Sequence, residues 1–270
     1  MGYTLATTTS NAENGYKLIQ CAYIDNNSYR DEWIFTKIQY SATIYNYYDK
    51  GYYVRYGETE TTSASKINSY IDAVSKQYLM LLGLEIVAPT AKYYESAIDT
   101  CKATVNSSNI NTLCSHTEPH TILFNSTNSV SNHFNNNTSP PGSDIITKAY
   151  WSGHRIRTYP NIEEYNRCYS SGASIYMLEL SSSSVRDRDA MGILMHELNH
   201  QYGAPDHYHE ILDEGTPNER CRGGEFCYEC GSNPRPTTCI MNKSRIDITD
   251  STVICAGCKA DMYTHLDNHH

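Results

Sequence analysis

Apolar and polar residues follow two different periods along the chain, which predict strands at the beginning and helices further on. Residues 16–23, YKLIQCAY, have the composition of a strand. The tyrosine-rich stretch 38–56 predicts a hairpin with a short loop at 49–51, DKG, where the glycine can adopt a positive φ. After residue 64 the period lengthens, and apolar side chains three or four positions apart predict a helix over 65–82 that ends at Gly83.

The second half of the chain contains one long polar stretch and then a strand followed by a helix. Residues 125–143 are too polar to pack and contain Pro-Pro-Gly, so we expect a surface excursion rather than a domain linker. Residues 173–180, ASIYMLEL, predict a strand. Ser184 is a suitable N-cap and Asp187 favours the first turn, so a helix should begin here. It should end at Gly203, which precedes a proline by two residues.

This second helix contains the residues that carry candidate chemistry, in HELNHQYGAPDHY at 196–208. At 100° per residue, His196 and His200 project one turn apart, away from the apolar side of the helix. Two imidazoles at i and i+4 can bind one tetrahedral metal ion, and Glu197 can reach a water on that ion. The glycine turn brings the chain back, so Asp206 or His207 can supply a third ligand.

These residues resemble the metzincin zinc peptidases, whose extended motif HExxHxxGxx[H/D] is matched by HELNHQYGAPD. GAPDHY resembles the snapalysin variant, in which the third ligand is an aspartate. The resemblance implies that His196, His200 and Asp206 hold the zinc and that Glu197 is the general base. It also implies a methionine turn beneath the metal, for which Met241 in CIMN is the candidate.

The chain beyond residue 206 is rich in cysteine. CYEC and CAGC are CxxC pairs with roughly the spacing of a structural zinc site. Archaemetzincins also combine a CxM turn with a later CxxC, and by that resemblance Cys239, Cys255 and Cys258 would bind a second zinc with one further cysteine. Disulfides in an oxidising compartment are the competing interpretation, and the sequence leaves both open. The cysteines concerned are Cys221, Cys227, Cys230, Cys239, Cys255 and Cys258.

Charge and composition exclude several classes of partner. The net charge is −9 and the pI is about 5.6, whereas a nucleic-acid partner normally requires a clustered basic face. No apolar run approaches the roughly 18 residues that a membrane span needs. Ten cysteines favour secretion with an export signal already removed, and a cytoplasmic enzyme is the alternative. We expect a monomer that acts on a peptide or protein substrate.

The sequence therefore predicts an α/β (α+β) fold: one metzincin-like catalytic domain, 1–270, with a mixed twisted sheet and an active-site helix. Its upper part would be 1–205, and its cysteine-rich lower part, 206–270, would include a short helix near 256–266. The expected function is a zinc-dependent endopeptidase in which residues 173–180 pair with an extended peptide. A zinc-stabilised binding or surface protein without catalysis is the alternative, although a purely structural site has no need of Glu197.

Overall fold

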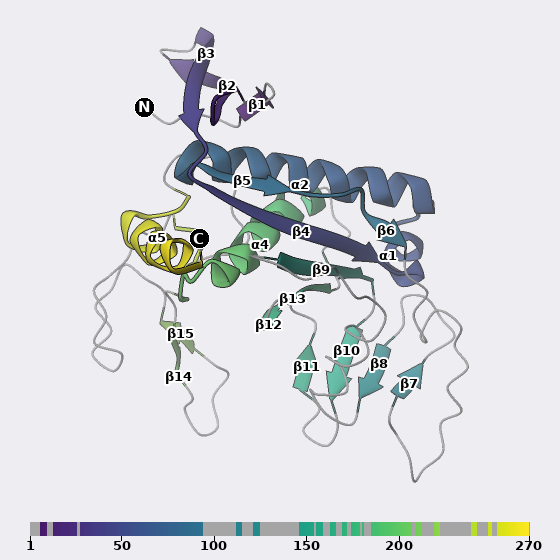
Figure 1. Ribbon diagram of the computed structural model, residues 1–270. Coiled ribbons are helices and arrows are strands. Elements are labelled where there is room, and N and C mark those ends of the chain that lie inside the picture. The colour runs from purple at the N-terminus through teal and green to yellow at the C-terminus, as the bar shows by residue number, and fades with distance from the viewer. Residues whose placement is uncertain are drawn as a thin grey trace. The chain divides into compact units, whose positions relative to one another are not determined.

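Figure 1 shows a computed structural model of the chain. The chain separates into two compact units. The first unit comprises residues 1–41, 72–86 and 188–270, and the second comprises 42–71 and 87–187. The predicted single domain with a division at residue 205 stays a prediction. The residues that the structure describes are 6–9, 13–25, 28–93, 112–114, 121–124, 146–153, 155–158, 163–165, 169–171, 174–178, 180, 185–206, 209–211, 219–221, 239–241, 248–249 and 253–269.

The second unit contains a mixed sheet with strand order β12-β13-β9-β4. Strand β9 pairs in parallel with β4 on one side and with β13 on the other, whereas β12 is antiparallel to β13. This register aligns Tyr47, Tyr150, Tyr176 and Tyr169 across the four strands. The predicted α/β class with a mixed sheet is confirmed. The strands are β4 (Tyr40–Tyr48), β9 (Ile146–Ser152), β12 (Tyr169–Ser171) and β13 (Ser174–Leu178), and β6 (Lys92–Tyr93) also pairs with β4.

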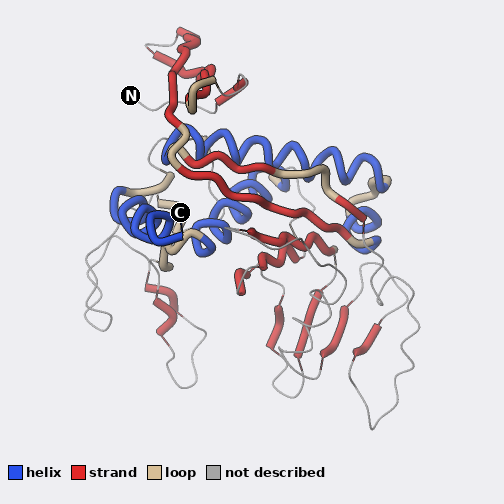
Figure 2. The backbone as a smooth tube through the Cα atoms, in the orientation of Figure 1, coloured by secondary structure: helices blue, strands red, loops and turns tan. Residues whose placement is uncertain are grey.

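The predicted hairpin over 38–56 is wrong. Strand β4 ends before Asp49, and a short helix, α1 (Lys50–Arg55), follows it directly (Figure 2). The Asp49 carboxylate accepts a hydrogen bond from the main-chain N–H of Tyr52 at 2.9 Å, which caps the helix. Its other oxygen accepts from the hydroxyl of Ser152 at 2.6 Å. The partner of β4 is therefore a strand distant in sequence, which local alternation cannot reveal.

Large aromatic side chains form the core of the second unit. Trp151 is fully buried, and its ring lies 5.9 Å from the rings of both Tyr52 and Tyr70. Its indole N–H donates to Asn46 at 3.2 Å, so the buried polar atom is satisfied. A second sheet in this unit has the order β11-β10-β8-β7, with β7 (Thr112–Cys114), β8 (Thr121–Phe124), β10 (Arg155–Thr158) and β11 (Glu163–Tyr165).

The long helix α2 (Glu60–Leu82) begins five residues before the predicted start and ends where expected, at Gly83 with φ 66°. Thr59 and Thr62 explain the earlier start, because the side-chain oxygen of each accepts a hydrogen bond from the main-chain N–H of the other. Residues 60–63 are all polar, so apolar periodicity gives no signal there. No described helix is long and apolar enough to cross a membrane.

The first unit begins with an antiparallel sheet of order β1-β2-β3. The strand predicted at 16–23 is confirmed, and Ile19 packs in a small core with Leu79. Near the other end of the chain, helix α5 matches the helix predicted at 256–266. This unit includes the second half of α2 and nearly all of α4 (Arg186–Gln201). Its other elements are β1 (Ala6–Thr9), β2 (Tyr16–Asp25), β3 (Ser28–Lys37), β5 (Leu84–Val87), β14 (His209–Ile211), β15 (Glu219–Cys221) and α5 (Ala256–His269).

The strand and helix predicted around the candidate motif are confirmed. Residues 174–178 form β13, and α4 (Arg186–Gln201) is the predicted motif helix. The chain leaves α4 through Gly203, whose φ of 92° favours glycine. The proposed N-cap, Ser184, and the polar stretch 125–143 lie outside the described residues.

Candidate metal centre

Helix α4 brings the predicted histidine pair together. His196 and His200 are one turn apart, and their ring centroids lie 4.9 Å from each other with the planes nearly perpendicular. His196 and the adjacent Glu197 are buried, with 4% and 5% of their surface exposed. Polar side chains that are buried this deeply need partners. The histidine pair is accordingly held by main-chain groups outside the helix.

The ring of His196 is oriented by a carbonyl from a distant segment. Its Nδ1 lies 2.9 Å from the main-chain oxygen of Ile240. A carbonyl can only accept, so Nδ1 carries the hydrogen and the lone pair of Nε2 is left to face a metal. Ile240 is itself fixed, because it is fully buried and its N–H donates to the oxygen of Val253 at 2.8 Å.

The ring of His200 is oriented by the turn that ends the helix. Its Nδ1 donates to the main-chain oxygen of Ala204 at 2.9 Å, and the N–H of Ala204 donates to the oxygen of Asn199 at 2.9 Å. Gly203 makes this turn possible, because a Cβ atom there would lie 2.6 Å from Cβ of His265. Its positive φ and this close approach both require glycine.

Asp206 completes a group of three potential ligands. Its Oδ1 lies 3.2 Å from Nε2 of His196 and 3.4 Å from Nε2 of His200, and all three ligand atoms lie within 4.8 Å of one another. Two imidazole nitrogens and one carboxylate oxygen are ordinary zinc ligands, and three protein ligands leave the fourth position open. The donor set therefore fits a catalytic zinc ion. The competing candidate, His207, lies outside the described residues.

The charged groups of this site shift one another's pKa values. Burial would raise the pKa of Asp206, but hydrogen bonds from His196 and His200 outweigh it and hold that pKa well below the usual range. Burial would lower the pKa of His200, but the Asp206 carboxylate outweighs it and raises that pKa. For Glu197, burial dominates and raises the carboxyl pKa. The site thus combines the ionised carboxylate of Asp206 with the carboxyl group of Glu197, whose proton affinity is higher.

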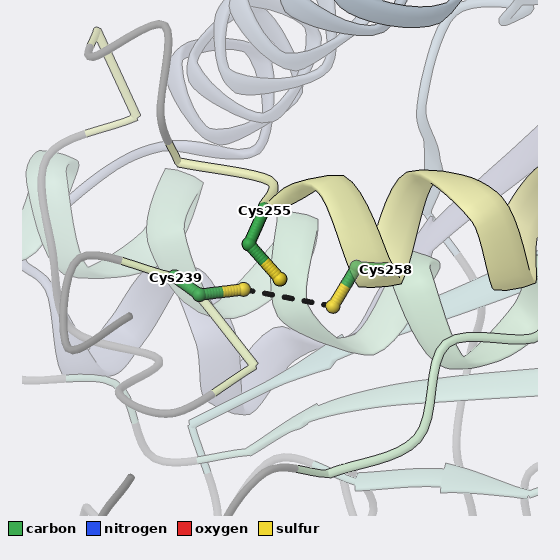
Figure 3. A group of neighbouring side chains, drawn as sticks. All are labelled: Cys239, Cys255 and Cys258. Carbon is green, nitrogen blue, oxygen red and sulfur yellow. Dashed lines mark hydrogen bonds between the residues drawn. The ribbon is translucent and has the colours of Figure 1, made fainter. Parts of the chain in front are cut away.

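A second group of potential ligands comprises the thiols of Cys239, Cys255 and Cys258 (Figure 3). All three are buried and free of disulfides, and the sulfur atoms of Cys239 and Cys258 are 3.6 Å apart. Zinc–sulfur bonds of about 2.3 Å place two sulfurs of a tetrahedral site about 3.8 Å apart, so this spacing fits a zinc ion. The hydrogen bond with Cys239, together with burial, raises the pKa of the Cys258 thiol.

Other cysteine predictions stay untested. Cys227 and Cys230 lie outside the described residues, as does the side chain of Cys221. Disulfides and secretion therefore remain predictions. The residue predicted for the methionine turn is described by the structure. Met241 is fully buried, lies in a turn and directly follows Ile240. Ile240 is the residue whose carbonyl orients His196, and the role of Met241 beneath a metal stays a prediction.

Some supporting groups were not predicted from the sequence. The carbonyl oxygens of Ala204 and Ile240 orient the two histidines, and main-chain oxygens leave no trace in the residue pattern. Asn199 was also missed, although an available signal was its polar side chain among the apolar positions of the helix. In the structure it is fully buried.

Comparisons with known proteins give matches among solved structures. No protein-family model and no curated protein matches the sequence. Among solved structures, the chain is similar to the crystal structure of archaemetzincin from Methanopyrus kandleri. The TM-score is 0.43 and the sequence identity 11%, with 84% of this chain and 96% of that chain covered. The functional assignment below therefore rests on the residues of the site.

Proposed function

We propose that this protein is a zinc-dependent peptidase that uses His196, His200 and Asp206 as metal ligands. The observation that carries the proposal is the convergence of two oriented imidazoles on one carboxylate oxygen, at 3.2 and 3.4 Å. Both Nδ1 atoms donate to carbonyls, so once the Nε2 atoms give up the protons that they share with Asp206, both Nε2 lone pairs are available to one ion. Asp206 is the expected third ligand by its spacing in the motif.

Glu197 is the general base in this proposal. Bound at these three ligands, zinc would polarise the scissile carbonyl and make a water more acidic. Glu197 would accept a proton from the attacking water at a carboxylate oxygen and then deliver it to the leaving amine nitrogen. Water is consumed, the peptide bond breaks, and a carboxylate and an amine are released. The predicted pairing of an extended peptide with residues 173–180 is wrong, because β13 lies between β12 and β9 and is already paired with a strand on each side.

We also propose that the cysteine cluster holds a second, structural zinc ion. Three buried thiols with compatible spacing support it, and the fourth ligand would be one of Cys221, Cys227 and Cys230. Disulfides remain the alternative for the cysteines outside the described residues. A non-catalytic zinc-binding protein is the alternative to the whole assignment. The buried Glu197 beside the ligands favours catalysis, because a structural site gains nothing from it.

Digestion of an unstructured protein substrate tests this function. We expect the zinc-loaded protein to cleave casein or a peptide library, a chelator to abolish cleavage, and added zinc to restore it. Cleavage that persists in the chelator after zinc has been shown to leave the protein would contradict the proposal. Zinc binding without any cleavage would favour the non-catalytic alternative.

A further inference from the structure

A buried tyrosine hydroxyl on helix α2 holds the second half of helix α4. The hydroxyl of Tyr78 donates to Oδ1 of Asn199 at 2.7 Å and also lies 3.0 Å from the main-chain oxygen of Met195. Tyr78 and Asn199 have no exposed surface. The ring of Tyr202 packs edge-on against that of Tyr78, with the centroids 5.5 Å apart, and restricts its position. Because water cannot reach this pair, loss of the hydroxyl would leave the amide oxygen unpaired.

The residue held in this way belongs to the metal-binding motif. Asn199 directly precedes the proposed ligand His200. Its main-chain oxygen accepts from the N–H of Ala204, and the oxygen of Ala204 accepts from Nδ1 of His200. A continuous series of hydrogen bonds therefore runs from the Tyr78 hydroxyl, through Asn199 and Ala204, to the ring of His200.

A buried asparagine in the last turn of a helix needs a physical reason. Burying an amide costs free energy unless it is hydrogen-bonded, and a leucine at position 199 would avoid that cost. Asparagine also has a lower helix propensity than leucine. This cost is offset if the amide fixes the position of the last turns of α4 relative to Tyr78, because these turns carry the two histidines that must converge on one ion. A hydrogen bond defines position more sharply than apolar contact does.

We propose that Tyr78 and Asn199 are positioning residues for the metal centre, acting through Ala204 on the ring of His200. Neither residue touches the metal or the substrate in this account. The inference rests on the proposed function, since it assumes that His200 is a ligand. Loss of the hydroxyl should weaken metal binding at the histidine–aspartate site, because the free protein would then hold the His200 ring in less well-defined orientations.

The test replaces Tyr78 with phenylalanine and measures Co²⁺ affinity by absorption, which separates nitrogen–oxygen coordination from thiolate coordination. We expect Tyr78→Phe to weaken Co²⁺ binding at the nitrogen–oxygen site about tenfold, as is typical when outer partners of a ligand are lost. Binding at the cysteine site should be unchanged. Tyr70→Phe is the matched control. It removes a hydroxyl of the same helix α2 that donates to Asp187 at 2.6 Å, at the start of α4 and not at its last turn.

The control should lose stability without losing metal affinity. The inference is overturned if Tyr78→Phe binds Co²⁺ within twofold of the parent, or if Tyr70→Phe weakens binding equally. Asn199→Ala provides a second measurement, and its effect should not add to that of Tyr78→Phe because the two share one hydrogen bond; full additivity would contradict the inference. A parent without a nitrogen–oxygen site overturns the proposed function and this inference together. A parent that binds Co²⁺ there and cleaves no peptide overturns the proposed function alone.

Discussion

His196 donates a hydrogen bond from Nδ1 to the main-chain oxygen of Ile240, a residue 44 positions further along the chain, at 2.9 Å. The same segment supplies Cys239 and Met241, which flank Ile240 and are fully buried. One short turn therefore supports a proposed catalytic ligand and contributes a thiol to the cysteine cluster. Because the turn contributes to both groups, substitutions of the cysteines should alter the orientation of the His196 ring.

The first prediction concerns the third ligand. Asp206→Ala should lose most of the zinc at the histidine–aspartate site and all peptidase activity, because two imidazoles alone bind zinc weakly. Asp206→Asn should retain part of the binding, since its amide oxygen is a poorer ligand. His207→Ala is the matched control and should keep the metal. Elemental analysis after gel filtration measures the zinc content of each variant. The assignment fails if His207→Ala loses the zinc while Asp206→Ala retains it.

The second prediction concerns the cysteine cluster. We expect about two zinc ions per chain, one at each group of ligands, and thiols at Cys239, Cys255 and Cys258 that react with alkylating reagents only after zinc is removed. Mass spectrometry of the unreduced protein should show no linked peptides among these three residues. A single zinc ion together with such a link would establish the disulfide interpretation instead.

The third prediction concerns stability against pH. Glu58 forms a salt bridge with the buried Arg186 and accepts from the hydroxyl of Ser63. Burial alone would raise the pKa of Glu58, but these bonds outweigh it and lower that pKa. A carboxyl whose folded pKa is depressed contributes stability above its unfolded pKa of about 4.3, and the contribution is lost as the pH falls through the folded value.

Glu58→Gln should therefore be less stable than the parent at pH 7, by about 1–2 kcal/mol, and the difference should shrink below about pH 4. Denaturant unfolding at several pH values measures this difference. Glu60→Gln, on the exposed first turn of α2, is the control and should change stability little at either pH. A difference for Glu58→Gln that is constant from pH 7 to pH 3 would exclude this explanation.

The sequence predicted the local parts of the fold and failed where a partner was distant. The end of α2 at Gly83 and the turn at Gly203 were predictable, since a glycine with positive φ ends a helix by local geometry alone. The ligand candidates were predictable because helical periodicity fixes which side chains lie together. The hairpin expected over 38–56 failed, because β4 pairs in parallel with β9, about a hundred residues later.

The supports of the site were equally unpredictable. The oxygens of Ile240 and Ala204 belong to main-chain groups that every residue has, so only the folded chain reveals which of them faces a histidine. The carboxylate of Asp206 differs, because the helix and a single glycine turn bring residues 206 and 207 back towards the histidines, and the resemblance to the metzincin motif indicates Asp206 of these two. For this reason the three-ligand group was accessible from the sequence, and the hydrogen bonds that orient it were not.

The most direct test of the central claim is the peptidase activity and zinc content of Glu197→Gln. The amide keeps the size and polarity of the side chain but cannot accept the proton, so zinc should remain bound at the level of the parent. Turnover of a peptide substrate should fall by at least about 100-fold, as is typical when a general base is lost. A zinc-loaded Glu197→Gln protein that cleaves the same peptide as fast as the parent would contradict the account.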